Sequence, residues 1–190
     1  VESGDGGWVG FDPKNPTTMY DTLPWVEGGL ERSDDGGSNW ISITANVNGV
    51  GMSDKALFYV PIAMDPTSSN TLYLGTYRLY KTTSRGNMWT LPSPGLSFSS
   101  SGTCSVRKKE DCISASSVAP SNGQDVYVGT NTGKFFASND GGNTFTQNDQ
   151  GLPSSPITKI AVDPNVPAKV YATFTGFGTG HVFLTANSGA

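Results

Sequence analysis

An eight-residue motif recurs along this chain at intervals close to 50 residues. It reads SDDGGSNW from Ser33 and SNDGGNTF from Ser138, with a weaker copy, TTSRGNMW, from Thr82 and the beginning of another, TANSGA, from Thr185. The four starts are separated by 49, 56 and 47 residues. A repeat of this length indicates a fold built by placing copies of one supersecondary unit side by side.

A second pattern keeps the same register as the motif. Dipeptides that end in proline begin at Asp12, Asp65, Ala119 and Asp163, and in each case a tyrosine follows eight residues later. These tyrosines are Tyr20, Tyr73, Tyr127 and Tyr171. Because two unrelated markers recur together, the chain contains a true internal repeat.

Each repeat contains four short runs with the alternation of β-strands. In the third repeat they read CISASSVAP, DVYVGT, KFFASND and TFTQND, separated by SNGQ, NTG and GGN. Such runs between turn formers are typical of strands, and four of them every 40–50 residues or so are typical of a β-propeller blade. We therefore predict an all-β propeller in which residues 1–190 form a single segment. The expected blades are 8–44, 56–93, 111–149 and an incomplete 157–187.

In this scheme the motif joins the third strand of a blade to the fourth. Its aspartate accepts hydrogen bonds from the backbone of its own turn, its glycine supplies a positive φ, and its aromatic residue packs between sheets. We assign these structural roles to Ser33, Asp35, Gly37, Trp40, Thr82, Gly86, Trp89, Ser138, Asp140, Gly142, Phe145, Thr185, Asn187 and Gly189.

A calcium loop is the alternative interpretation of the motif, because it is acidic and rich in glycine. Calcium loops need several carboxylates and a terminal bidentate glutamate, whereas each motif carries one or two acids. In the second copy Ser84 stands in place of the aspartate and Arg85 follows it, which a turn tolerates and a metal site does not. The sequence therefore predicts no metal site and no cofactor.

The chain resembles the Asp-box, or bacterial neuraminidase repeat, family of β-propellers. The segments that carry the resemblance are ERSDDGGSNWISI, YKTTSRGNMWTLP, FASNDGGNTFTQ and FLTANSGA. The family includes sialidases, xyloglucan-cleaving endoglucanases, sortilin-type receptors and photosystem assembly factors. The segments that flank the motif in this chain also resemble the inner strands of secreted bacterial members of the family. The resemblance implies that the boxes lie at the blade periphery, remote from the ligand face.

The last copy of the motif stops at Gly189 and Ala190, before its aromatic residue. Propellers have about four to eight blades and close by joining the first to the last. We therefore expect this chain to be part of a larger propeller of about six to eight blades. A closed four-bladed ring, or two chains that assemble one ring, are the alternatives.

Charge and cysteine content limit the partners and the compartment. The net charge of -4 gives no reason to expect nucleic-acid binding, and no apolar run is long enough for a membrane span. Cys104 and Cys112 lie eight residues apart, and a disulfide between them would indicate an extracellular or periplasmic protein. Two unpaired surface thiols are the alternative.

The loops between the second and third strands of the blades are expected to form the ligand face. They offer aromatic residues beside polar ones, which suits a sugar or protein ligand, although each aromatic alone could instead serve blade packing. The ligand-face candidates are Trp25, Tyr77, Arg78 and Phe177.

A polysaccharide hydrolase needs two carboxylates across a cleft. The carboxylates that could form such a pair are Asp5, Glu27 and Asp54, and an Asx turn before Trp8 is the alternative role for Asp5. A sialidase needs three arginines for its substrate, and of the four present only Arg78 is well placed.

Two functional hypotheses follow. The first is a secreted, non-catalytic propeller that binds a glycan or a protein partner or acts as an extracellular scaffold. The second is a glycoside-hydrolase-like enzyme with further catalytic residues on blades outside this chain.

Overall fold

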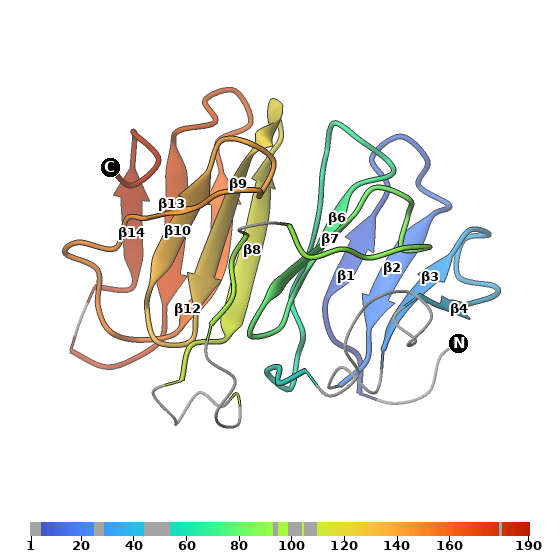
Figure 1. Ribbon diagram of the computed structural model, residues 1–190, viewed down its shortest axis with the longest axis horizontal. Coiled ribbons are helices and arrows are strands. Elements are labelled where there is room, and N and C mark those ends of the chain that lie inside the picture. Colours follow the sequence, from blue (N-terminus) through green and yellow to red (C-terminus); the bar gives the residue numbers. More distant parts are fainter. Residues whose placement is uncertain are drawn as a thin grey trace.

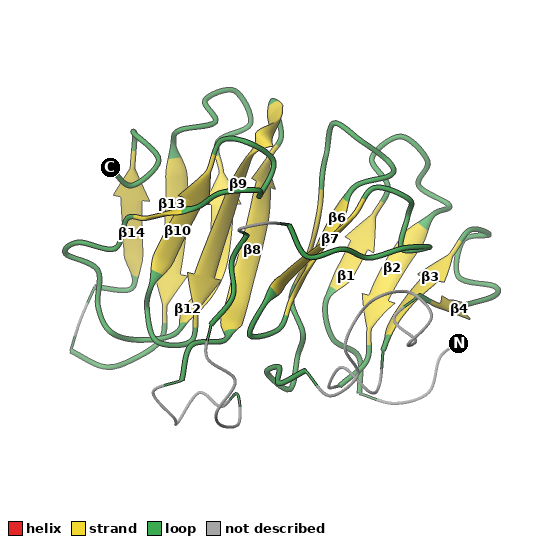
Figure 2. Ribbon diagram, in the orientation of Figure 1, coloured by secondary structure: helices red, strands yellow, loops and turns green. Residues whose placement is uncertain are grey.

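The computed structural model describes residues 5–24, 29–43, 54–92, 95–98, 104, 110–178 and 180–190. All regular elements in these ranges are β-strands, as Figure 2 shows. The strands are β1 (Val9–Phe11), β2 (Met19–Thr22), β3 (Leu30–Ser33), β4 (Ile41–Ser42), β5 (Ile62–Met64), β6 (Leu72–Gly75), β7 (Leu79–Thr82), β8 (Ile113–Ala119), β9 (Asn122–Thr130), β10 (Phe135–Ser138), β11 (Thr146–Gln147), β12 (Ile157–Val162), β13 (Val170–Phe174) and β14 (Val182–Thr185).

The strands form four antiparallel sheets, each a simple meander in chain order. The first and third sheets have four strands, β1 to β4 and β8 to β11, and the second and fourth have three, β5 to β7 and β12 to β14. In the second sheet the place of a fourth strand is marked by an isolated bridge between Lys81 and Thr90. The prediction of an all-β chain built from propeller blades is confirmed.

The hydrophobic core consists of three clusters, and each lies between two neighbouring blades. Tyr20 and Leu30 of the first blade pack with residues of the second, including Leu74 and Trp89. Corresponding clusters join the second blade to the third and the third to the fourth. A single blade therefore buries its apolar side chains only against its neighbours.

Two of the motif's aromatic side chains pack between blades, as expected from the sequence. Trp89 is buried and its indole N–H donates a hydrogen bond to the Ile43 carbonyl of the first blade at 2.8 Å. Phe145 packs on the cluster between the second and third blades. Trp40 differs because it is half-buried and donates instead to Gly37 of its own turn. Trp89 and Phe145 point toward the preceding blade, and the described chain has no blade before the first.

The motif forms a closed turn whose hydrogen bonds are the same in the first and third blades. In the third blade the Ser138 hydroxyl accepts the Gly142 N–H at 2.9 Å and donates to the Asp140 carboxylate, which also accepts the Thr144 N–H. Ser33 and Asp35 repeat these contacts in the first blade.

The other two copies keep the turn without an aspartate. Thr82 accepts the Gly86 N–H at 3.1 Å, and the Ser84 hydroxyl accepts the Met88 N–H in place of the carboxylate. In the last copy Thr185 bonds Gly189 N–H and the Asn187 side chain. The equivalent glycines all have φ between 83° and 90°, a region that side chains other than glycine rarely adopt.

Hydrogen bonds to the turn lower the pKa of both aspartates. Asn39 and Ser33 bring the pKa of Asp35 down from the ordinary 3.8 to about 2, and Thr144 has the same effect on Asp140. A carboxyl group whose pKa is lower in the folded state stabilises the fold above its unfolded pKa. This contribution is lost as the pH falls through the folded value.

Replacing Asp140 by Asn should therefore change the acid sensitivity of the protein. We expect the Tm of the natural chain to fall more steeply between pH 5 and pH 2 than the Tm of Asp140→Asn. The reason is that only the natural chain has a carboxylate at this position that becomes protonated over this range. Thermal melts followed by circular dichroism measure the difference. Asp149→Asn, outside the motif, is the matched control, and equal slopes for Asp140→Asn and the natural chain would contradict the account.

Candidate functional site

The two edges of the blades carry different loops. In the fourth blade, Figure 1 shows the motif turn at the C-terminus on the upper edge and the loop between β13 and β14 on the lower edge. The first strand of each blade also begins at the lower edge, because it runs antiparallel to the second. Side chains from all four blades can therefore meet at this edge.

A cavity of about 510 Å³ lies where these first strands begin. Trp8 precedes β1, Phe58 and Tyr59 precede β5, Ser114 belongs to β8, and Thr158 belongs to β12. An adjoining hollow of about 340 Å³ shares Trp8 and Tyr59 with it and is also lined by Lys159. The lining thus combines three aromatic rings with hydroxyl groups and one ammonium group.

The aromatic rings are held in place by local contacts. The Trp8 backbone is fixed to Thr22, whose hydroxyl accepts the Trp8 N–H at 2.8 Å. The rings of Phe58 and Tyr59 meet edge to face, with centroids 4.8 Å apart, and both are partly exposed. These three residues therefore present apolar ring surface to the cavity.

Lys159 joins the first and fourth blades across this site. Its Nζ lies 4.2 Å from the centroid of the Trp8 ring, a cation–π distance. Burial lowers the pKa of the Lys159 ammonium group, because a charged group loses hydration there. The arrangement can bind a ligand that has both an apolar face and hydrogen-bonding groups.

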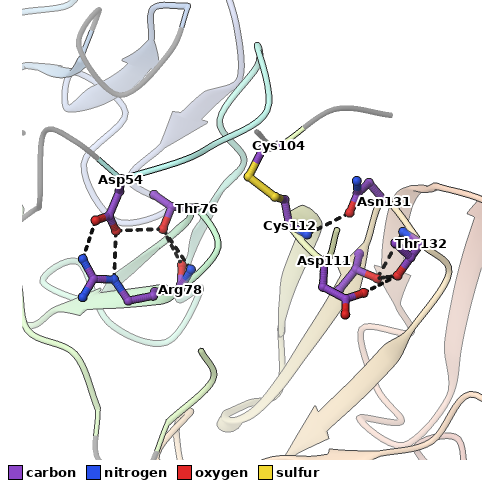
Figure 3. Close-up of a disulfide and its surroundings, with 9 residues drawn as sticks. Asp54, Thr76, Arg78, Cys104, Asp111, Cys112, Asn131 and Thr132 are labelled. Carbon is purple, nitrogen blue, oxygen red and sulfur yellow. Dashed lines mark hydrogen bonds and ion pairs between the residues drawn. A yellow bond between two sulfur atoms is a disulfide. The ribbon is translucent and has the colours of Figure 1, made fainter. Parts of the chain in front are cut away.

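Arg78 and Asp54 form an ion pair beside the loop between β6 and β7, as Figure 3 shows. The guanidinium group contacts both carboxylate oxygens, and Oδ2 also accepts hydrogen bonds from Thr76 at 3.1 Å and Tyr80 at 2.7 Å. The bond to Asp54 raises the pKa of Arg78. The buried Asp54 carboxylate thus anchors the loop, and its oxygens are engaged by neighbouring side chains.

A similar arrangement holds the next loop, between β9 and β10. The Lys134 ammonium group lies 2.6 Å from the Asp111 carboxylate, which also accepts a hydrogen bond from Thr132. Next to it, Cys112 is joined to Cys104 by a disulfide, and its N–H donates to the Asn131 side chain (Figure 3). In both blades, therefore, an acid ahead of the first strand fixes the second-to-third strand loop.

The structure brings together only some of the residues nominated from the sequence. Arg78 lies over the Tyr77 ring at 4.9 Å, next to Asp54. Phe177 is fully exposed on the loop between β13 and β14, and Asp5 is exposed ahead of Trp8. Trp25 and Glu27 lie outside the described residues.

Sequence reasoning missed Trp8, Phe58, Tyr59 and Lys159 as site residues. Phe58 and Tyr59 carried a usable signal, because they are aromatic residues a few positions ahead of a first strand, and Trp8 also lies ahead of one. Lys159 gave no such signal, since a lysine alternating with apolar residues in a strand is typical of a solvent-facing position.

A second cavity, of about 530 Å³, lies between the third and fourth blades. It is lined by Phe135 and Asn148 of the third blade and by Phe183 and Asn187 of the fourth. The Asn148 N–H donates to the Phe135 carbonyl, and in the first blade the Ile43 N–H donates to the Leu30 carbonyl in the same way, so Asn148 corresponds to Ile43. The Trp89 side chain donates its indole N–H to the Ile43 carbonyl. The cavity beside Asn148 therefore corresponds to the place that Trp89 takes between the first two blades.

No group of three or more histidine, cysteine, aspartate or glutamate residues in the described part of the chain could hold a metal ion. The described residues likewise include no helix that is long and apolar enough to cross a membrane.

The fold is similar to solved structures of GH74 enzymes. The Niastella koreensis GH74 enzyme aligns with 100% of this chain and 30% of its own, with a TM-score of 0.70 and 22% identity. The GH74 xyloglucanase from Xanthomonas campestris aligns over the same shares, with a TM-score of 0.68 and 17% identity. YCF48 bound to a D1 peptide aligns with 95% of this chain and 53% of its own, with a TM-score of 0.56 and 11% identity.

These likenesses establish the β-propeller fold. The chain spans less than a third of the length of the two GH74 enzymes. No protein-family model and no curated protein matches the sequence.

Removing the partner of the buried Asp54 carboxylate should destabilise the fold. We expect Arg78→Met to lower the free energy of unfolding by about 3 kcal/mol, because a buried charge is left unpaired. Asp54→Asn combined with Arg78→Met should cost less than the sum of the two single changes. Urea unfolding of the four proteins measures this coupling, and additive losses would show that the pair does not act as a unit.

Proposed function

We propose that this chain is a glycan-binding β-propeller module that takes its ligand at the aromatic cavity. The observation that carries the proposal is the meeting of Trp8, Phe58 and Tyr59, from two blades, around one cavity. A sugar ring presents C–H groups on its faces and hydroxyl groups at its rim. Aromatic side chains pack against such faces, and nearby hydroxyl groups such as Ser114 and Thr158 bond the rim.

The fold similarity supports a choice of ligand for the first tests. One of the similar propellers is a xyloglucanase, so β-linked glucans with and without xylose branches are the natural starting set. A secreted location is part of the proposal, because the Cys104–Cys112 disulfide is stable in an oxidising compartment.

A glycoside-hydrolase activity is the second candidate, and the likeness to GH74 enzymes favours testing it. Hydrolysis of a glycosidic bond needs two carboxylates near the scissile bond. The described lining of the two hollows at this edge contains no aspartate or glutamate. Catalytic carboxylates would therefore have to come from outside the described lining.

Changing the aromatic rings should weaken glycan binding. We expect Trp8→Ala and Tyr59→Ala each to raise the Kd for a bound β-glucan oligosaccharide about tenfold, because each removes a ring face from the site. Isothermal titration calorimetry measures the effect, with Met88→Ala as the control at an exposed position far from the cavity. A glycan array without binding, or unchanged affinity in both variants, would refute the proposed site.

The two candidate functions separate in an assay for reducing sugar. We expect binding of β-glucans without release of reducing ends from β-glucans or sialosides. Release that persists in Asp5→Asn and Asp54→Asn would favour an enzyme whose carboxylates lie elsewhere.

A further inference from the structure

Lys159 is the one charged side chain in the described lining of the two hollows at the lower edge. Besides Lys159, the smaller hollow is lined by Gly6, Gly7, Trp8, Val9 and Tyr59. Asp5 precedes Gly6 in the chain, but its side chain lines neither hollow. The site therefore carries a positive charge and, in its described lining, no negative one, although the chain as a whole has a net charge of -4.

The ammonium group of Lys159 has no acidic partner among the described residues. Two other lysines are paired with aspartates, Lys134 with Asp111 and Lys169 with Asp163. The Lys159 Nζ instead lies over the Trp8 ring and makes no hydrogen bond or ion pair with a described residue. Burial disfavours the charged form of this lysine and lowers its pKa. An anion next to Nζ would stabilise the charged form.

Two backbone N–H groups of the smaller hollow are also without a partner in the described part of the chain. The Gly6 and Gly7 N–H groups donate no hydrogen bond there, whereas the Trp8 N–H donates to the Thr22 hydroxyl. Gly7 packs directly on Thr22, where a side chain would collide with the Thr22 carbonyl. Successive backbone N–H groups and a nearby ammonium group suit an anionic oxygen.

The two hollows together define the shape of the ligand. They share Trp8 and Tyr59, so one ligand can occupy both. The larger hollow, with its three aromatic rings, suits the face of a sugar ring, and the cation lines only the smaller one. A hexuronic acid matches this arrangement, because its carboxylate lies at the rim of the ring and leaves the ring faces free to pack on aromatic side chains.

We infer that the cavity selects an acidic glycan and places a hexuronate carboxylate against the Lys159 Nζ and the Gly6 and Gly7 N–H groups. The sugar ring packs in the larger hollow beside Phe58 and Tyr59. A neutral glucan can fill the same hollow but lacks the contact with the ammonium group. This inference rests on the proposed glycan site and adds the charge of its ligand.

Two oligosaccharides that differ only in the carboxylate test the inference. One is a linear β-glucan oligosaccharide, and the other is the same oligosaccharide with its primary alcohol groups oxidised to carboxylates. We expect isothermal titration calorimetry of the natural chain to give a Kd about tenfold lower for the oxidised form, because a charge-assisted hydrogen bond is added. This preference should shrink as the salt concentration rises, since Lys159 is partly exposed to solvent.

Variants of two lysines assign the preference to Lys159. Lys159→Met should bring the ratio of the two Kd values close to one, and Lys159→Arg should retain a preference because it keeps the charge. Lys169→Met is the matched control, since it removes the same charge from the same blade at the opposite edge, and it should keep the ratio of the natural chain. Lys159→Gln replaces Lys159→Met if the latter loses the circular dichroism spectrum of the natural chain.

The outcomes separate this inference from the proposed function. Equal affinity of the natural chain for the two oligosaccharides, or a preference that Lys159→Met retains, would overturn the inference and leave the glycan site in place. A ratio that Lys169→Met lowers as much as Lys159→Met would also overturn it, because the effect would then follow the charge of the whole chain. Binding of neither oligosaccharide would refute the glycan site itself, and the inference with it.

Discussion

Packing between neighbouring blades is the constraint on which the rest of this structure depends. Each of the three core clusters takes its apolar side chains from two blades, and buried tyrosines reach from one blade to the motif turn of the next. The turns fix the position of these acceptors through hydrogen bonds within the motif itself. The repeated motif thus serves the contact between blades, and the acids at its centre accept hydrogen bonds from the backbone of their own turn.

This packing also creates the candidate site. The first strands of four blades converge at one edge and bring together residues that are distant in sequence. The Lys159 Nζ, for example, lies 4.2 Å from the centroid of the Trp8 ring. The loops around that edge are held by the ion pairs Arg78–Asp54 and Lys134–Asp111. The fold therefore separates two tasks, with structural turns at one edge and an aromatic cavity at the other.

The sequence was sufficient for the fold but not for the site. The repeat, the glycines with positive φ and the serine-aspartate pairs are local signals, so the blades and their turns could be predicted. The bridge at Thr90 is shorter than the expected fourth strand, since Pro92, two residues on, has no N–H to donate to a sheet. The cavity depends on contacts between four repeats, which no local pattern encodes, and Lys159 was therefore missed.

The central claim is that the aromatic cavity receives the ligand. Nuclear magnetic resonance of the ¹⁵N-labelled chain during titration with a β-glucan oligosaccharide tests it most directly, since each indole N–H gives its own signal. The account predicts a saturable shift of the Trp8 signal, at the cavity, while the buried Trp89 signal stays in place. Shifts that centre on Trp89 or Trp40 and leave Trp8 unmoved would contradict it.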